Sequence, residues 1–272
     1  MDAYKRLYIV TGKGGVGKTL NALSLTSYLQ SQNKKAKLVF FSNSKLDPKA
    51  VEYSEVKLLA DQANIDYLGL ELIESCRQYI ALKLKSQTIA SWVIKTPFFK
   101  SLVNMIPGFN YLIYMGQILD DLSSDPDLIY VLDSPSSGHA LTMFEATKNF
   151  NKIFSSGVLY NDTQKMLTYL RMPHFLKIII LTLPTSLAIN EAMELKENLN
   201  NSENFDIDVV CNNTLMSFQS EQLPAPIRHK IENEAKALEQ HKETIQQCIP
   251  FSLGSNTQEL IKDLSPSMTQ LV

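Results

Sequence analysis

The residues that most directly indicate chemistry lie near the start of the chain, where the apolar run Leu7 to Val10 leads into TGKGGVGKT. Gly12, Gly17, Lys18 and Thr19 fill the spacing G-x-x-x-x-G-K-[ST]. In loops with this spacing, backbone N–H groups surround the phosphates, the lysine reaches the β and γ oxygens, and the hydroxyl holds Mg²⁺. The glycines let the loop curl with its amides inward, and the following helix adds the positive end of its dipole. The spacing therefore predicts a site for a nucleoside triphosphate and Mg²⁺.

A second lysine, Lys13, lies in the same loop before Lys18. Two ammonium groups on one loop repel each other at the same phosphate pair, so Lys13 is expected to point elsewhere. The sequence KGGVGKT, from Lys13 to Thr19, resembles the signature of the deviant-P-loop ATPases. In that group the early lysine reaches the nucleotide of a partner subunit, so the resemblance implies a dimer bridged by nucleotide. The alternative is a solvated Lys13 in a monomer.

A carboxylate, Asp133, directly follows the apolar run Leu128 to Leu132. At the carboxyl edge of a parallel sheet, such a carboxylate commonly holds Mg²⁺ together with the hydroxyl of the phosphate-binding loop. We therefore predict Thr19 and Asp133 as the metal-site residues, the alternative being a carboxylate that only caps a turn. The Ser- and Gly-rich residues 134–138 suit a loop that senses the γ-phosphate.

These residues need a frame, and short β-rich runs alternating with helical segments supply one. Such alternation predicts an α/β fold with a mostly parallel sheet flanked by helices, here as a single domain over residues 1–272. The predicted strands are Leu7 to Val10, Leu38 to Phe41, Leu128 to Leu132, Lys177 to Leu183 and Val209 to Cys211. The predicted helices are Leu20 to Ser31, Leu187 to Leu199, and a mostly solvated one from about Pro226 to Gln247.

The stretch from Ser54 to Leu122 departs from this alternation, because it is rich in helix-forming residues and contains no convincing core strand. It predicts a helical insertion over about residues 54–122. Its apolar density exceeds what one amphipathic face requires, which permits an exposed apolar surface. The alternative, that these side chains pack among the helices of the insertion, stays open.

The composition bounds the possible partners and the compartment. The 272 residues are 44% hydrophobic and 20% charged, as in ordinary globular proteins, and the net charge of −2 argues against nucleic acid as a partner. The cysteines form no C-x-x-C pair, so neither a zinc knuckle nor a disulfide framework is indicated. The N-terminal residues do not resemble a signal peptide, and Pro107 and Gly108 interrupt the longest uncharged stretch, so no transmembrane segment and a cytoplasmic location are expected.

The segment DSPSSGHAL, from Asp133 to Leu141, resembles the DTAPTGHTL switch of the arsenite-pump and tail-anchored-protein-targeting ATPases. Asn212-Asn213 is similar to that family's adenine contact, and Ile249 to Phe251 to its late loop over the base. The resemblance covers nearly the whole chain and implies ATP and Mg²⁺ as cofactors. The nucleotide contacts so predicted are Gly12, Lys13, Gly14, Gly15, Val16, Gly17, Lys18, Thr19, Leu20, Asn212 and Pro250.

The chain departs from the family pattern at the first switch, where the family carries the aspartate that activates the attacking water. Without a gap Ser44 occupies that position, and serine is a poor general base. With a three-residue insertion Asp47 supplies the carboxylate, and both alignments remain open. The predicted catalytic residues are Lys13, Lys18 and Asp47, and hydrolysis depends on the last of them.

Three functions follow from the resemblance. The first is an ATPase whose dimer, formed with an identical or a paralogous subunit, closes on ATP and controls a surface for a hydrophobic or membrane-protein client. The second is a degenerate subunit that binds nucleotide and pairs with an active paralogue. The third is a partitioning or positioning ATPase, which the C-terminal segment fits poorly because its only cation is Lys262.

Overall fold

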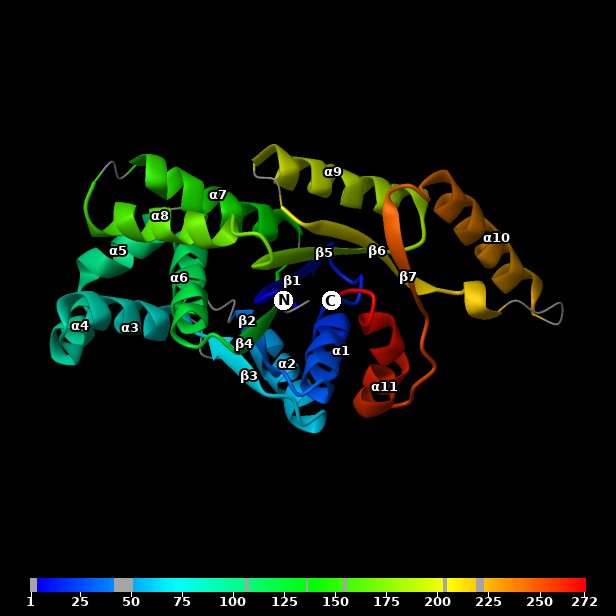
Figure 1. The fold of residues 1–272 in the computed structure, drawn as a ribbon, viewed down its shortest axis with the longest axis horizontal. Coiled ribbons are helices and arrows are strands. Elements are labelled where there is room, and N and C mark those ends of the chain that lie inside the picture. Colours follow the sequence, from blue (N-terminus) through cyan, green and yellow to red (C-terminus); the bar gives the residue numbers. More distant parts are fainter. Residues whose placement is uncertain are drawn as a thin grey trace.

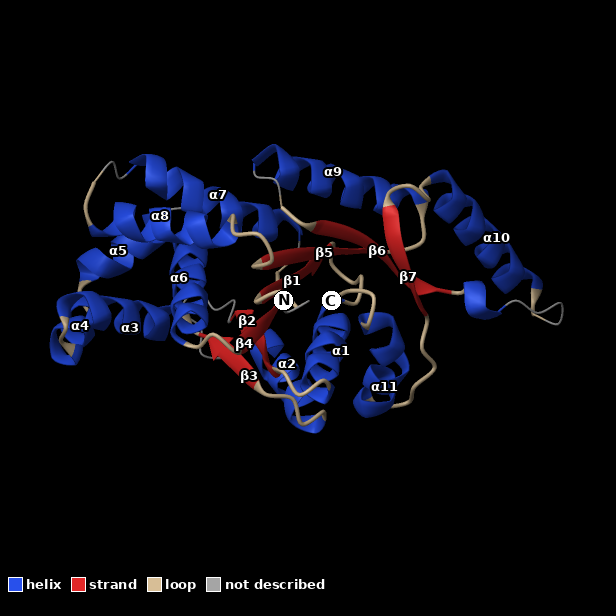
Figure 2. Ribbon diagram, viewed as in Figure 1, coloured by secondary structure: helices blue, strands red, loops and turns tan. Residues whose placement is uncertain are grey.

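The structure is a computed structural model, and it describes residues 4–41, 51–105, 108–135, 137–153, 156–202, 205–218 and 223–272. Within these residues a seven-stranded sheet runs through the middle of the molecule (Figures 1 and 2). The strands are β1 (Leu7–Gly12), β2 (Lys35–Phe41), β3 (Tyr67–Leu70), β4 (Leu128–Asp133), β5 (Leu176–Thr182), β6 (Ile207–Thr214) and β7 (Ile245–Pro250).

The strand order is β3-β2-β4-β1-β5-β6-β7, and each neighbouring pair is parallel. This arrangement confirms the predicted α/β class with a parallel sheet. β1 lies at the centre, between β4 and β5, and the loop that follows it opens at the carboxyl edge of the sheet. At this point the strand order reverses, because β2 lies on one side of β1 and β5 lies on the other. Ligands of open parallel sheets bind at this kind of switch point.

β1 is buried along its whole length, and residues 7–10 are large and mostly apolar, because both of its faces are covered. Leu7 and Ile9 belong to one buried cluster, and Tyr8 and Val10 belong to the other. On the face of Tyr8 lie α1 (Lys18–Ser31), α2 (Val51–Gln62) and α11 (Thr257–Met268); on the face of Ile9 lie α6 (Phe109–Ser124), α7 (Ser137–Ile153) and α9 (Ser186–Ser202) (Figure 1). The predicted helices over 20–31 and 187–199 are confirmed as α1 and α9.

A group of helices extends beyond one end of the sheet, at the left of Figure 1. These helices are α3 (Leu72–Leu84), α4 (Gln87–Val93), α5 (Pro97–Met105) and α8 (Val158–Leu170), which gather around the outer part of α6. The segment predicted as a helical insertion over residues 54–122 also contains one strand, β3, which pairs in parallel with β2 at the edge of the sheet. β3 is a short edge strand of four residues that includes Gly69, and this composition gives a weak strand signal.

The predicted helix from Pro226 to Gln247 is also too long. The structure has α10 (Ala225–Gln240), preceded by the 3₁₀ turn η1 (Met216–Phe218) and followed by β7. β7 is an edge strand whose alternating burial leaves polar side chains on its outer face, which hides it from a search for apolar runs. Among the described helices, none combines the length and the apolarity that a membrane crossing requires.

Candidate functional site

The loop from Gly12 to Thr19, here called the P-loop, requires glycine at two positions. Gly12 has φ +144°, and a Cβ added there would lie 2.3 Å from the carbonyl oxygen of Leu181 on β5. Gly17 has φ +90°, and its Cβ would lie 2.5 Å from Nδ2 of Asn212. These φ values lie in the region that L side chains avoid. Both glycines of the motif are therefore fixed by backbone conformation and by close neighbours.

The remaining residues of the loop lead the chain from β1 into α1. Gly14 and Gly15 are exposed and Val16 is buried, while Leu20 packs partly buried against the α1 side of the core. Gly17 is the N-cap of α1 but supplies no side-chain cap, and the first turn of the helix contains no acidic residue. The positive end of the helix dipole is thus left for an anion at the P-loop.

Lys18 and Thr19, the first two residues of α1, reach in different directions. The Lys18 Nζ donates to the carbonyl oxygen of Lys13 at 3.0 Å, so the ammonium lies over the loop. The Thr19 Oγ1 donates to Oδ2 of Asp133 at 2.7 Å. The structure thus brings together the two residues predicted for the metal, a hydroxyl and a carboxylate of the kind that Mg²⁺ prefers.

Asp133 is held in place because it is the last residue of β4, which pairs directly with β1. The next residue, Ser134, is buried, and its N–H donates to the carbonyl oxygen of Val10 at 3.0 Å. The next helix, α7, begins at Ser137. The topology, and not a local motif, therefore sets the position of Asp133 beside the P-loop.

Asn212 connects β6 to the P-loop. Its Nδ2 donates to the carbonyl oxygen of Val16 at 2.8 Å, while its Oδ1 is buried and has no hydrogen-bond partner within the described residues. A buried acceptor without a partner is unfavourable by about 1–3 kcal/mol, unless a ligand supplies a donor. Pro250, the other predicted base contact, ends β7 opposite Thr214, and the N–H of Phe251 donates to the carbonyl oxygen of Thr214 at 2.9 Å.

Lys13 makes a contact that the sequence did not indicate. Its Nζ donates to Oε1 of Glu191 on α9, with exposed side-chain fractions of 63% for the lysine and 38% for the glutamate. The pair lies on a cavity of about 330 Å³ lined by the first half of the P-loop, β5 and α9. Of the predicted site residues, this cavity contacts Gly12, Lys13, Gly14 and Val16 but not Lys18, Thr19, Asp133 or Asn212. Lys13 and Lys18 therefore face different surroundings.

The two candidates for the water-activating residue, Ser44 and Asp47, lie outside the described residues, as does Ser136 of the second switch. Gly138 and His139 belong to the first turn of α7. The structure thus assembles the P-loop, Asp133, Asn212 and Pro250 at one edge of the sheet. It also places Glu191 beside Lys13, a contact between residues 178 positions apart that the sequence did not predict.

Comparison with known proteins yields distant relatives. No family model matches the chain. It is 24% identical to the ATPase ASNA1 homolog of Cryptosporidium parvum over 152 residues, which cover 54% of this chain and 40% of that protein. It is 21% identical to the ATPase BagA of Mycobacterium tuberculosis and to a putative ATPase of Mycobacterium bovis over 207 residues, which cover 71% of this chain and 61% of each relative.

The matches span between two fifths and about three fifths of the length of these curated relatives. A parallel sheet with a P-loop after its central strand is the fold expected of proteins named as ATPases. The chain is a distant homologue of these proteins, which are named as ATPases.

Proposed function

We propose that this chain binds ATP with Mg²⁺ and hydrolyses it as a dimer, and that closure of the dimer controls a surface for a hydrophobic client. The observation that carries the proposal is the assembly of two separate segments, the ends of β4 and β6, around the P-loop. Thr19 donates to Asp133, and Asn212 donates to Val16, so β4 and β6 both present a polar side chain to the loop that follows β1.

The roles of the residues follow from their positions. The amides of Gly14 to Thr19 and the Lys18 ammonium would bind the phosphates, because they lie at the uncapped start of α1. Thr19 and Asp133 would hold Mg²⁺, which when bound offsets the charge of the β- and γ-phosphates. The buried, unpartnered Oδ1 of Asn212 suits the exocyclic amine of adenine, and Pro250 at the end of β7 is the second base contact that we propose. These observations support ATP as the ligand.

Lys13 would act in the dimer rather than on the nucleotide of its own subunit. Its side chain is 63% exposed, and its ammonium is held by Glu191 of the same chain. We propose that ATP-dependent closure exchanges this contact for one with the phosphates bound to the partner subunit. The partner is either a second copy of this chain or a paralogous ATPase.

The client surface would lie on the helices at the end of the sheet. Large apolar side chains are exposed there: Trp92 is 70% exposed on α4, and Phe98 and Met105 are each 77% exposed on α5. Exposed apolar side chains gathered on one part of a protein commonly mark an interaction surface. We propose one domain over residues 1–272, in which the helical insertion of about residues 54–122 contacts a hydrophobic or membrane-protein segment.

The test measures nucleotide affinity and ATP turnover separately, using purified full-length chain. Lys18→Ala should reduce ATP affinity strongly, whereas Lys262→Ala, which removes an exposed lysine on α11, should leave it unchanged. Equal ATP affinity in both variants would refute the assignment of the P-loop.

Turnover then distinguishes an ATPase from a degenerate subunit. Asp47→Asn should abolish hydrolysis and retain binding if Asp47 is the base, and Ser44→Ala should then have little effect. Tight ATP binding without turnover in the unmodified chain would favour the degenerate subunit. The mass of the ATP-trapped complex separates a homodimer from a monomer, and a monomer with bound ATP would refute the role of Lys13 in trans.

A further inference from the structure

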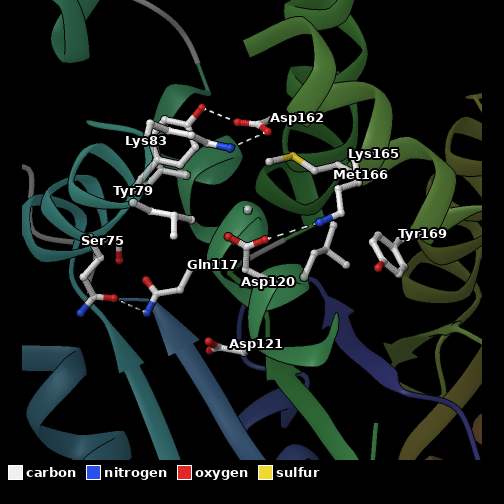
Figure 3. Close-up of a pocket in the computed structure, with 15 residues that line it drawn as sticks. Ser75, Tyr79, Lys83, Gln117, Asp120, Asp121, Asp162, Lys165, Met166 and Tyr169 are labelled. Carbon is white, nitrogen blue, oxygen red and sulfur yellow. Dashed lines mark hydrogen bonds and ion pairs between the residues drawn. The ribbon is translucent and has the colours of Figure 1, made fainter. Parts of the chain in front are cut away.

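A cavity of about 220 Å³ lies among α3, α6 and α8, away from the P-loop (Figure 3). Its apolar wall includes the buried side chains of Ile113, Leu119 and Met166. Gly116 also lines the cavity, and a Cβ at this position would meet the terminal methyl of Met166 at 2.9 Å. The cavity is therefore built into the packing of the helices, and the polar side chains that line it decide what it can bind.

The hydrogen-bond donors of one wall are already engaged. The Tyr79 hydroxyl and the Lys83 ammonium both donate to Asp162, at 2.6 and 2.7 Å, and each contacts a different carboxylate oxygen. Figure 3 shows these contacts on the α3 and α8 side of the cavity. The Lys83 ammonium also lies 5.4 Å from the centre of the Tyr79 ring. On this wall the charges of Lys83 and Asp162 offset each other, so the wall offers a ligand mainly apolar surface.

The opposite wall presents an acceptor, and a chain of hydrogen bonds fixes its orientation. Arg77 donates to both oxygens of Glu74, and this contact lowers the pKa of that carboxyl, so Glu74 is an acceptor only. Gln78 must then donate its Nε2 to Glu74, at 2.9 Å, which leaves its Oε1 to accept from Nε2 of Gln117 at 3.1 Å. The Oε1 of Gln117 is consequently the free end of the chain. It is buried and has no hydrogen-bond partner within the described residues.

Two carboxylates lie close by on the same helix. Asp121 accepts from the Tyr130 hydroxyl at 2.9 Å, and burial raises the pKa of this carboxyl. Asp120 has only a loose contact with Lys165, 3.9 Å away, and both side chains are at least half exposed. Counting the charged residues that line the cavity gives three carboxylates, Asp120, Asp121 and Asp162, against two ammonium groups, Lys83 and Lys165.

We propose that this cavity binds a small organic cation, a protonated amine carried on an apolar or aromatic body. The ammonium would donate to Gln117 Oε1 and to the carboxylates of Asp120 and Asp121, while the body packs against Ile113 and Met166. The volume equals roughly seven water molecules, which limits the ligand to a small molecule. This site is separate from the nucleotide site, because Asp121 lies on α6, before β4, whereas Asp133 is the last residue of β4. Amine binding can therefore be tested without nucleotide.

The test uses phenethylamine as the probe and phenethyl alcohol as a neutral control of the same shape, with the full chain and binding followed by calorimetry. The amine should bind with a Kd of about 1 mM or below, and the alcohol about tenfold more weakly, because charge-assisted hydrogen bonds distinguish them. Equal affinity for both compounds, or binding of neither, would overturn the proposal.

Variants of the lining residues locate the binding. Gln117→Leu and Asp121→Asn should each weaken the amine about tenfold, since each removes one partner of the ammonium. Asp127→Asn changes an exposed aspartate outside the cavity and should have no effect. Unchanged affinity in Gln117→Leu would refute the role of the buried acceptor. If Asp121→Asn fails to fold, Asp120→Asn at the mouth of the cavity applies the same test, and unchanged affinity there also counts against the proposal.

Discussion

Removal of the Glu191 carboxylate should strengthen ATP-dependent dimerisation, because it releases Lys13 from its own subunit. The Lys13–Glu191 pair is solvated, with exposed side-chain fractions of 63% and 38%, so it contributes about 0.2–1 kcal/mol. Loss of the pair shifts the equilibrium between paired and free Lys13 toward the free form, by a factor of about 1.4–5 in each subunit. A symmetric dimer has two such pairs, so Glu191→Gln should tighten the dimer by a factor of about 2–30 if the two contributions add.

The assay is sedimentation of the full chain with a non-hydrolysable ATP analogue, over a range of protein concentrations. Glu197→Gln is the matched control, because it makes the same charge change on α9 at an exposed residue outside the Lys13 cavity. The gain in Glu191→Gln should shrink as salt is raised, because salt screens an exposed ion pair. A dimer that is unchanged or weaker in Glu191→Gln than in Glu197→Gln would refute the reasoning.

Three further perturbations test the site and the helices. Gly17→Ala should destabilise the chain by at least about 1–2 kcal/mol in thermal unfolding and abolish ATP binding, because φ is +90° and the new methyl meets Asn212; an unchanged melting curve would contradict this. Thr19→Val should lower ATP affinity about tenfold with Mg²⁺ but little without it, since it removes the hydroxyl beside Asp133; an equal loss in both conditions would argue against a metal ligand. The pKa of Glu74 is lowered by the arginine one turn later, so its stabilising contribution is present above the unfolded pKa and lost as pH falls through the folded pKa; acid unfolding of Glu74→Gln should therefore show a shallower pH dependence.

The residues that were predictable from the sequence are those fixed by local patterns. The P-loop could be found because Gly12, Gly17 and Lys18 stand at a spacing that one turn requires, and each of the two glycines proves to have a positive φ. Asp133 could be found because an apolar run ending in a carboxylate predicts the carboxyl edge of a parallel strand. In both cases the neighbours along the chain contain the information.

What the sequence did not reveal depends on contacts between distant segments or on edge strands. Glu191 meets Lys13 only because α9 follows β5, the neighbour of β1 on the side away from β4. β3 and β7 lie at the two edges of the sheet, where burial on one face is enough and polar residues are tolerated. The amide chain that ends at Gln117 joins α3 to α6 across 39 residues, and no periodicity predicts it.

One strand links the nucleotide site to the helical part of the molecule. β4 carries Tyr130, which donates to Asp121 at the cavity, and three residues later Asp133, which accepts from Thr19. The helix before this strand is α6 and the helix after it is α7, and Gly108 at the start of α6 lies so close to α7 that a Cβ would approach the Ala146 methyl to 2.7 Å. The interior around this strand is close-packed, and such interiors transmit strain. A displacement of Asp133 is therefore expected to reach α6 along β4, through Tyr130 and Asp121, and through α7, which contacts α6 at Gly108.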